Sequence, residues 1–119
     1  KGVIIEWAKK IAEADGYIII TPEYNHGYPA VLKNALDVIY KEWNYKPVSF
    51  VSYGAVSAGI RAVEQLKQVV LELKMIPMHE EVNIHFVWAA FDENGNPAEE
   101  SLNGKAEALV KTLDLYLKK

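Results

Sequence analysis

One short segment, residues 17–21, constrains the fold more than any other feature of this 119-residue sequence. Its run Tyr-Ile-Ile-Ile-Thr has no polar alternation, which is typical of a strand that is covered on both faces. A second strand is predicted at residues 48–52. Residues 75–86 read as extended but broken, because Pro77 cannot donate a hydrogen bond to a neighbouring strand.

Segments with helical periodicity separate these strands. Apolar residues recur at helical spacing after residue 4, after Pro29, after Gly59 and after Asn96. We expect the second helix to run from Pro29 to Trp43, and the last to start at an Asn96 cap and continue to Leu117. Strict alternation of helices and strands predicts one α/β domain, residues 1–119, with a parallel sheet between helices.

The composition excludes several classes of function. Thirteen basic and sixteen acidic residues give a net charge of −3, so no basic surface exists for nucleic acid. The sequence has no cysteine, which excludes disulfides, thiol nucleophiles and thiolate metal sites. His79 and His85 would lie roughly 20 Å apart in an extended segment, too far to share a metal ion. We expect no metal, no membrane span and a cytoplasmic location.

Two loops, residues 22–28 and 53–59, follow the first two strands. The carboxyl ends of parallel strands meet at one edge of the sheet, where ligands bind in such folds. Tyr24 offers a flat aromatic face, and Asn25 can donate and accept hydrogen bonds at once, which suits a planar heterocycle. The second loop is small and rich in backbone N–H groups, but it lacks the lysine of a phosphate loop. A polar surface loop and a plain strand-to-helix connection remain the alternative interpretations.

Motifs in both loops resemble those of a known family. Thr21-Pro22-Glu23-Tyr24-Asn25, followed by Pro29 and residues 32–37 (Leu-Lys-Asn-Ala-Leu-Asp), resembles the signature of NAD(P)H-dependent FMN reductases. Residues 52–66 are similar to the second flavin loop of that family and its helix. The resemblance implies a flavodoxin-like three-layer sandwich with a parallel sheet, and FMN with NADPH or NADH as co-substrate. It implies flavin contacts by Pro22, Glu23, Tyr24, Asn25, Ser52, Tyr53 and Gly54.

The sequence also departs from the family pattern. Family members begin with a central strand and a Gly-Ser-x-Arg-x-x-Ser loop that grips the FMN phosphate, and the sequence has no such loop. The chain is therefore interpreted as the carboxy-terminal portion of the fold, with the isoalloxazine half of the site. Without the central strand, residues 17–21 would present an uncovered edge that favours aggregation unless upstream residues or a partner supply a strand.

The resemblance implies an oxidoreductase that passes hydride from NAD(P)H through FMN to a quinone, azo, nitro or similar small-molecule acceptor. No catalytic side chain is expected, because the cofactor supplies the chemistry. A flavodoxin-type electron carrier and a non-catalytic fragment without flavin are the alternatives.

The sequence allows more than one role for several side chains. Glu23 is interpreted as a backbone or helix-cap partner rather than a general base. Arg61 is either a phosphate contact or a surface residue, and His26 a ligand, subunit or solvent contact. The resemblance implies a homodimer or homotetramer, for which exposed aromatic residues are predicted at Tyr40, Trp43 and Tyr45.

Overall fold

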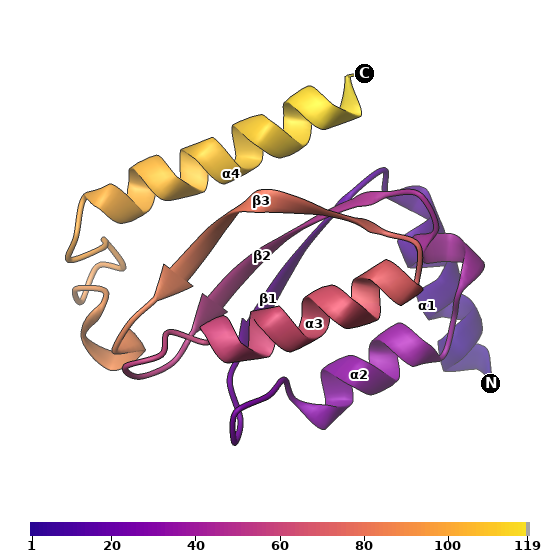
Figure 1. Cartoon of the computed structure of the whole chain (residues 1–119), viewed down its shortest axis with the longest axis horizontal. Helices are drawn as coiled ribbons and strands as arrows, with labels where there is room; N and C mark the ends of the chain where they lie inside the picture. Colours follow the sequence, from indigo (N-terminus) through magenta and orange to yellow (C-terminus); the bar gives the residue numbers. More distant parts are fainter. Residues whose placement is uncertain (119) are drawn as a thin grey trace.

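The computed structural model describes residues 1–118 and confirms the α/β fold with a parallel sheet (Figure 1). The strands lie side by side in the order β1-β2-β3, and both pairings are parallel. The elements along the chain are α1 (Gly2–Glu13), β1 (Tyr17–Pro22), α2 (Ala30–Asp37), the 3₁₀ turn η1 (Lys41–Trp43), β2 (Pro47–Tyr53), α3 (Ile60–Glu72), β3 (Ile76–Ile84), the 3₁₀ turn η2 (Val87–Ala89) and α4 (Ser101–Leu117).

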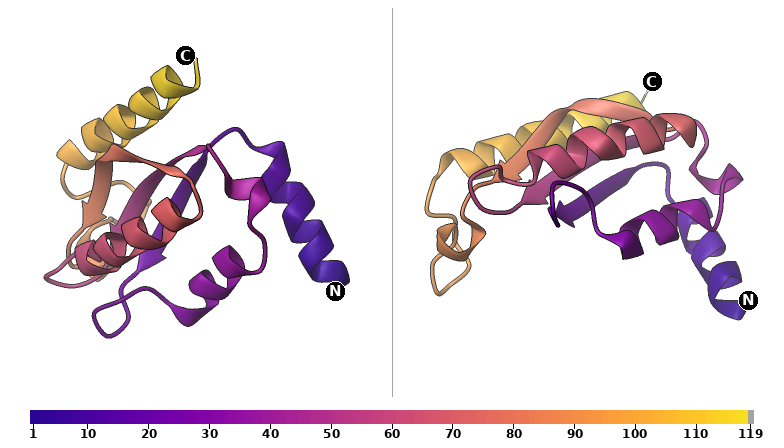
Figure 2. Two further views of the ribbon diagram at one scale, coloured as in Figure 1. Left: turned by 45° about the vertical axis from the view of Figure 1, so that its right-hand side comes forward. Right: turned by 60° about the horizontal axis from the view of Figure 1, so that its bottom comes forward.

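Helices cover both faces of the sheet, which gives three layers (Figures 1 and 2). Helices α2 and α3 lie on one face, where Val48 and Phe50 of β2 are fully buried. Helix α4 lies on the other face and packs against β3 and β2. The main core therefore lies between the sheet and the α2/α3 layer; it includes Leu36, Trp43, Val48, Phe50, Val63, Leu66, Val70 and Met75.

Strand β1 is covered on one face only, contrary to the expectation from its apolar run. Ile19 packs against the core, whereas Ile18 and Ile20 point to the α4 side and are 43% and 64% exposed. Helix α4 packs mainly over β3 and β2, so these two side chains of β1 stay exposed. Within residues 1–118, β1 pairs with β2 alone, so its second edge has no neighbouring strand.

Helix α2 ends at Asp37, six residues before the end predicted from periodicity. Two tryptophan side chains explain the early stop. The indole N–H of Trp7 donates to the carbonyl of Ala35 at 2.8 Å, and that of Trp43 donates to the carbonyl of Leu36 at 3.0 Å. These carbonyls would otherwise need further helical turns or water. The chain can therefore leave the helix and bring Trp43, which is only 3% exposed, back into the core.

The last helix begins at Ser101 rather than next to Asn96. Asn96 belongs to a turn instead, because its N–H donates to the Asp92 carboxylate at 2.9 Å and its carbonyl accepts from the Asp92 N–H. The expected break in β3 is confirmed: its register against β2 shifts just after Pro77. No helix within residues 1–118 combines the length and apolar character needed to cross a bilayer.

Candidate functional site

The two loops singled out in the sequence meet at the carboxyl ends of β1 and β2. Parallel pairing places Pro22 opposite Tyr53, so both loops leave the sheet at the same level. A pocket of about 190 Å³ lies between them. It is lined by Glu23, Asn25 and Gly54, which the sequence predicted, and also by His26, Ala55, Val56, Ser57, Gly59 and Arg61.

The first loop contains a tight two-residue hairpin. The N–H of Tyr24 donates to the carbonyl of Gly27 at 2.8 Å, and the N–H of Gly27 donates back to Tyr24 at 3.1 Å. Asn25 and His26 between them have φ values of 51° and 74°. Such a turn favours Asn-Gly, so His26 adopts a left-handed conformation that costs energy for a residue with a side chain. The strained turn places Asn25 and His26 at the pocket.

The second loop is held by a buried serine and a glycine. The Ser52 hydroxyl donates to the carbonyl of Ala58 at 2.7 Å and accepts from the Asn83 amide at 2.9 Å. Gly59 has a φ of 78°, and a Cβ added there would lie 2.7 Å from the Cβ of Ser52. Only glycine therefore fits at the start of α3. The Ser52 side chain therefore fixes the second loop by its hydrogen bond to Ala58 and its close approach to Gly59.

Glu23 turns its side chain toward the start of α3. Its carboxylate accepts a hydrogen bond from the backbone N–H of Arg61 at 3.2 Å and forms an ion pair with the Arg61 guanidinium. Burial alone would raise the pKa of Glu23, but hydrogen bonds from Arg61 and from the N–H of Ala62 hold that pKa below its usual value. The interpretation of Glu23 as a helix-cap partner is confirmed, and Arg61 is engaged with a carboxylate.

The remaining predicted residues lie around this pocket without lining it. Pro22 and Tyr53 end their strands opposite each other, Tyr24 is 62% exposed, and Ser52 is buried. Gln65 was not predicted as a site residue, yet its side-chain amide donates to the carbonyl of His26 at 2.7 Å. The spacing of Arg61 and Gln65, four residues apart on one helical face, is the signal that could have revealed it.

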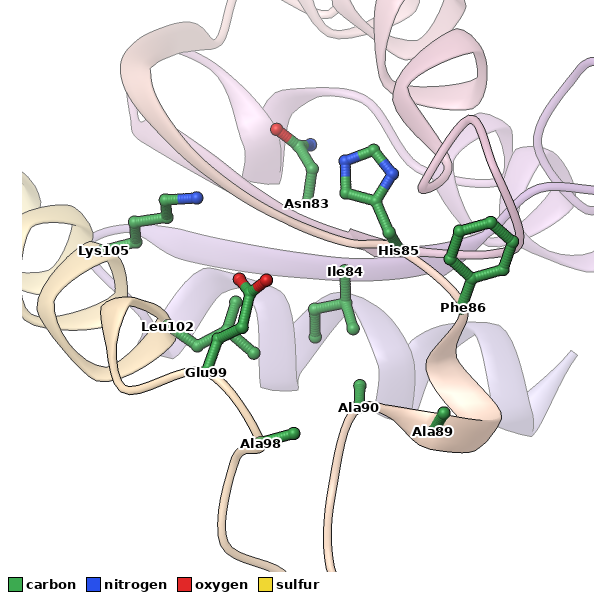
Figure 3. A pocket seen from close by; sticks show the side chains of 10 residues that line it. All are labelled: Asn83, Ile84, His85, Phe86, Ala89, Ala90, Ala98, Glu99, Leu102 and Lys105. Carbon is green, nitrogen blue, oxygen red and sulfur yellow. The ribbon is translucent and has the colours of Figure 1, made fainter.

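A second cavity, of about 270 Å³, lies between the end of β3 and the start of α4 (Figure 3). Ile84 and Leu102 form part of its apolar wall, and Glu99 and Lys105 also line it. His85, at its margin, is 2.9 Å from the carbonyl of Val56 and so lies next to the second loop. Across residues 1–118, no three His, Cys, Asp or Glu side chains gather as a metal site.

The predicted exposed aromatic cluster is only partly correct. Trp43 is buried in the core, where its ring packs edge-to-face with Tyr17 at 5.0 Å between centroids. Tyr40 and Tyr45 are exposed, and the Lys74 ammonium lies 6.0 and 5.8 Å from their ring centroids. Trp43 is therefore not available for a subunit contact.

Known flavin and quinone reductases are similar to this chain in sequence. The chain is 58% identical over 69 residues to an NAD(P)H-dependent FMN reductase of Schizosaccharomyces pombe, which covers 58% of this chain and 34% of the relative. It is 32% identical over 120 residues to an NADPH:quinone oxidoreductase of Arabidopsis thaliana, covering 96% of this chain and 61% of the relative. The chain thus spans about a third to three-fifths of the length of these relatives.

A solved structure has a similar arrangement of helices and strands. The flavoenzyme FerB of Paracoccus denitrificans, an NAD(P)H:(acceptor) oxidoreductase, matches with a TM-score of 0.73 and 26% identity, covering 99% of this chain and 67% of that one. Residues 1–89, which include both loops and the whole sheet, match the family described as NADPH-dependent FMN reductase. The chain therefore belongs to the NADPH-dependent FMN reductase family.

Proposed function

We propose that the pocket between the two loops holds the ring system of FMN in an oxidoreductase that takes electrons from NADPH or NADH. One observation carries the proposal: both loops line one pocket, and the second loop contains backbone N–H groups that have no acceptor within residues 1–118. Asn25 lines it from the first loop, and residues 54–57 line it from the second. The resemblance and the family membership support the same cofactor.

The donors at the pocket fit the pyrimidine end of a flavin. No acceptor within residues 1–118 pairs with the backbone N–H groups of Ala55, Val56 and Ser57. The flavin pyrimidine ring presents two carbonyl oxygens and one N–H, which backbone donors and a side-chain amide can satisfy together. A pocket of about 190 Å³ accommodates one end of the ring. The described residues therefore fit the isoalloxazine half of the cofactor.

In this proposal the protein binds and orients the ring. Asn25 and the second loop hold its polar edge, and Tyr24, Pro22 and Tyr53 flank it at the ends of the strands. Gly54 completes the contact, Ser52 holds the second loop in place from its buried position, and Glu23 supports the first loop. When bound, FMN would supply the redox chemistry, which is hydride transfer from a nicotinamide and onward electron transfer to an acceptor. We assign no proton transfer to a side chain of this chain.

A quinone is the proposed acceptor. The Arabidopsis relative is named an NADPH:quinone oxidoreductase, and its match extends over 96% of this chain. Azo and nitro compounds, which the family resemblance also implies as acceptors, stay predictions. The predictions of a cytoplasmic location and of a homodimer or homotetramer also remain to be measured.

Flavin binding tests the proposal directly. Titration of FMN with the chain should quench flavin fluorescence, and Asn25→Ala should weaken the affinity about tenfold, equivalent to ~1.4 kcal/mol. Asn103→Ala, on the exposed face of α4, is the matched control and should leave the affinity unchanged. Equal affinities of wild type and Asn25→Ala would contradict the assignment of the pocket.

Turnover separates an enzyme from a carrier. With FMN and NADPH present, the protein should accelerate quinone reduction at steady state, as followed by NADPH absorbance. Tight FMN binding with no acceleration would indicate an electron carrier instead. A protein that neither binds FMN nor accelerates the reaction would overturn the proposal for this chain.

A further inference from the structure

Helix α3 holds the first loop by two side chains. Arg61 and Gln65 lie one turn apart, and both reach back to residues about forty positions earlier in the chain. Two nitrogens of the Arg61 guanidinium contact one carboxylate oxygen of Glu23, and the Arg61 backbone N–H donates to the other oxygen at 3.2 Å. The Gln65 amide donates to the carbonyl of His26 at 2.7 Å.

The start of α3 and the 24–27 hairpin each need a stabilising partner from elsewhere in the chain. The first N–H groups of an α-helix have no acceptor within the helix, and the N-cap residue of α3, Gly59, has no side chain to accept from them. The hairpin in turn contains two non-glycine residues with positive φ, Asn25 and His26. Such conformations persist where the surroundings enforce them. The Glu23 carboxylate accepts from the first turn of α3 and, because Glu23 directly precedes Tyr24 in the chain, it also holds the hairpin beside the helix.

We propose that Arg61 is a positioning residue: through Glu23 it fixes the 24–27 hairpin against α3 and so sets the orientation of Asn25 on which flavin affinity depends. The inference rests on the proposed flavin site, and it extends that site by a residue that acts without touching the ring. Only 7% of the Glu23 side chain is exposed, and its two carboxylate oxygens are both engaged by Arg61.

The arrangement distinguishes positioning from a direct effect of charge. If Arg61 acted on the flavin by its positive charge, removal of the Glu23 charge would leave Arg61 unpaired and would strengthen that effect. If the two residues act as one unit, removal of either weakens flavin binding equally. Arg61→Lys keeps the charge but loses the two-nitrogen contact, so it should recover only part of the affinity.

A double-mutant cycle tests whether Glu23 and Arg61 act together on flavin binding. We expect Glu23→Gln and Arg61→Gln each to raise the FMN dissociation constant about tenfold, and the double variant to raise it about tenfold as well. Lys67→Gln is the matched control, because Lys67 lies on the same helix in ion pairs with Glu64 and Glu81, away from the pocket. The control should bind FMN as the wild type does. Additive losses, about a hundredfold in the double variant, would overturn the proposal.

Hydrogen exchange in the flavin-free protein supplies an independent readout. The N–H groups of Tyr24 and Gly27 close the hairpin, so they should exchange faster in Glu23→Gln and Arg61→Gln than in wild type or Lys67→Gln. Unchanged exchange in those two variants would overturn the positioning role, whatever the affinity. A wild type that fails to bind FMN would count against the flavin site itself, while exchange would still decide whether Arg61 orders the hairpin.

Discussion

The two faces of the sheet differ sharply in how completely they are covered. On the α2/α3 face, Val48 and Phe50 have no exposed surface, and the indole groups of Trp7 and Trp43 satisfy helix carbonyls. On the α4 face, a single helix covers β3 and β2 and leaves Ile20 of β1 64% exposed. Stability within this chain should therefore come mainly from one face, and self-association from the other.

The largest expected effect is on the closed face. Phe50→Ala should lower the free energy of unfolding by about 3–5 kcal/mol, since it removes a fully buried ring and leaves a cavity. Ile20→Ala on the open face should change it far less. Urea unfolding followed by circular dichroism measures both, and Phe50→Leu, with an expected loss of about 1.5 kcal/mol or less, gives a folded variant for the same comparison. Similar losses for Phe50→Ala and Ile20→Ala would contradict the difference between the faces.

The next largest loss in the free energy of unfolding is expected when the indole hydrogen bond of Trp43 is removed. Trp43→Phe keeps an aromatic ring but leaves the buried carbonyl of Leu36 without its donor, at a cost of about 1–3 kcal/mol. Trp88→Phe is the control: Trp88 is 73% exposed, and its replacement should stay within about 0.5 kcal/mol. Equal stability of the Trp43→Phe variant and the wild type would show that Trp43 does not end α2 in this way.

A third effect is confined to alkaline pH. Burial, together with the charges of Glu42 and Asp15, raises the pKa of Tyr17 to about 12. The folded state therefore keeps the Tyr17 proton where the unfolded chain, with an ordinary pKa near 10, has lost it. This contribution is complete below about pH 10 and is lost as pH rises toward 12. Tyr17→Phe should flatten that part of the stability profile, whereas Tyr24→Phe, at an exposed tyrosine, should leave it unchanged.

The smallest effect on stability is predicted on the open face itself. Ile20→Thr keeps a β-branched residue in β1 and should change the free energy of unfolding by about 0.5 kcal/mol or less. It should nevertheless reduce association, measured as mass against concentration by light scattering, because it breaks the exposed apolar surface next to an unpaired strand edge. Val31→Thr, at an exposed position of α2, should leave association unchanged.

Sequence periodicity predicted the alternation of helices and strands, the parallel sheet and the meeting of the two loops, because these follow from local apolar patterns and from the geometry of parallel sheets. It placed the end of α2 and the start of α4 wrongly. Both boundaries depend on side chains that satisfy backbone groups at a distance: Trp7 and Trp43 for α2, and Asp92 for the turn before α4. Periodicity within a segment contains no information about such partners.

The candidate site likewise contains residues that local sequence predicts and residues that depend on partners distant in sequence. Asn25, Glu23 and Gly54 were predicted as site residues and line one pocket, because they belong to the loops themselves. Gln65 was missed, and Arg61 was left with two alternatives, because each acts on a residue 38 or 39 positions away. Exposed polar residues on a helix are usually solvated. Only the docking of the first loop against α3 gives these two a specific partner.

The helix cap of α3 also has a consequence for the order in which the molecule assembles. A cap within one helix forms with the helix, but this cap comes from a carboxylate 38 residues earlier and needs β1 already beside β2. We therefore expect the pocket to form late in folding, after the sheet. Glu23→Gln should accelerate unfolding and leave the folding rate nearly unchanged in stopped-flow measurements. A slower folding rate in that variant would show instead that the two loops belong to the folding nucleus.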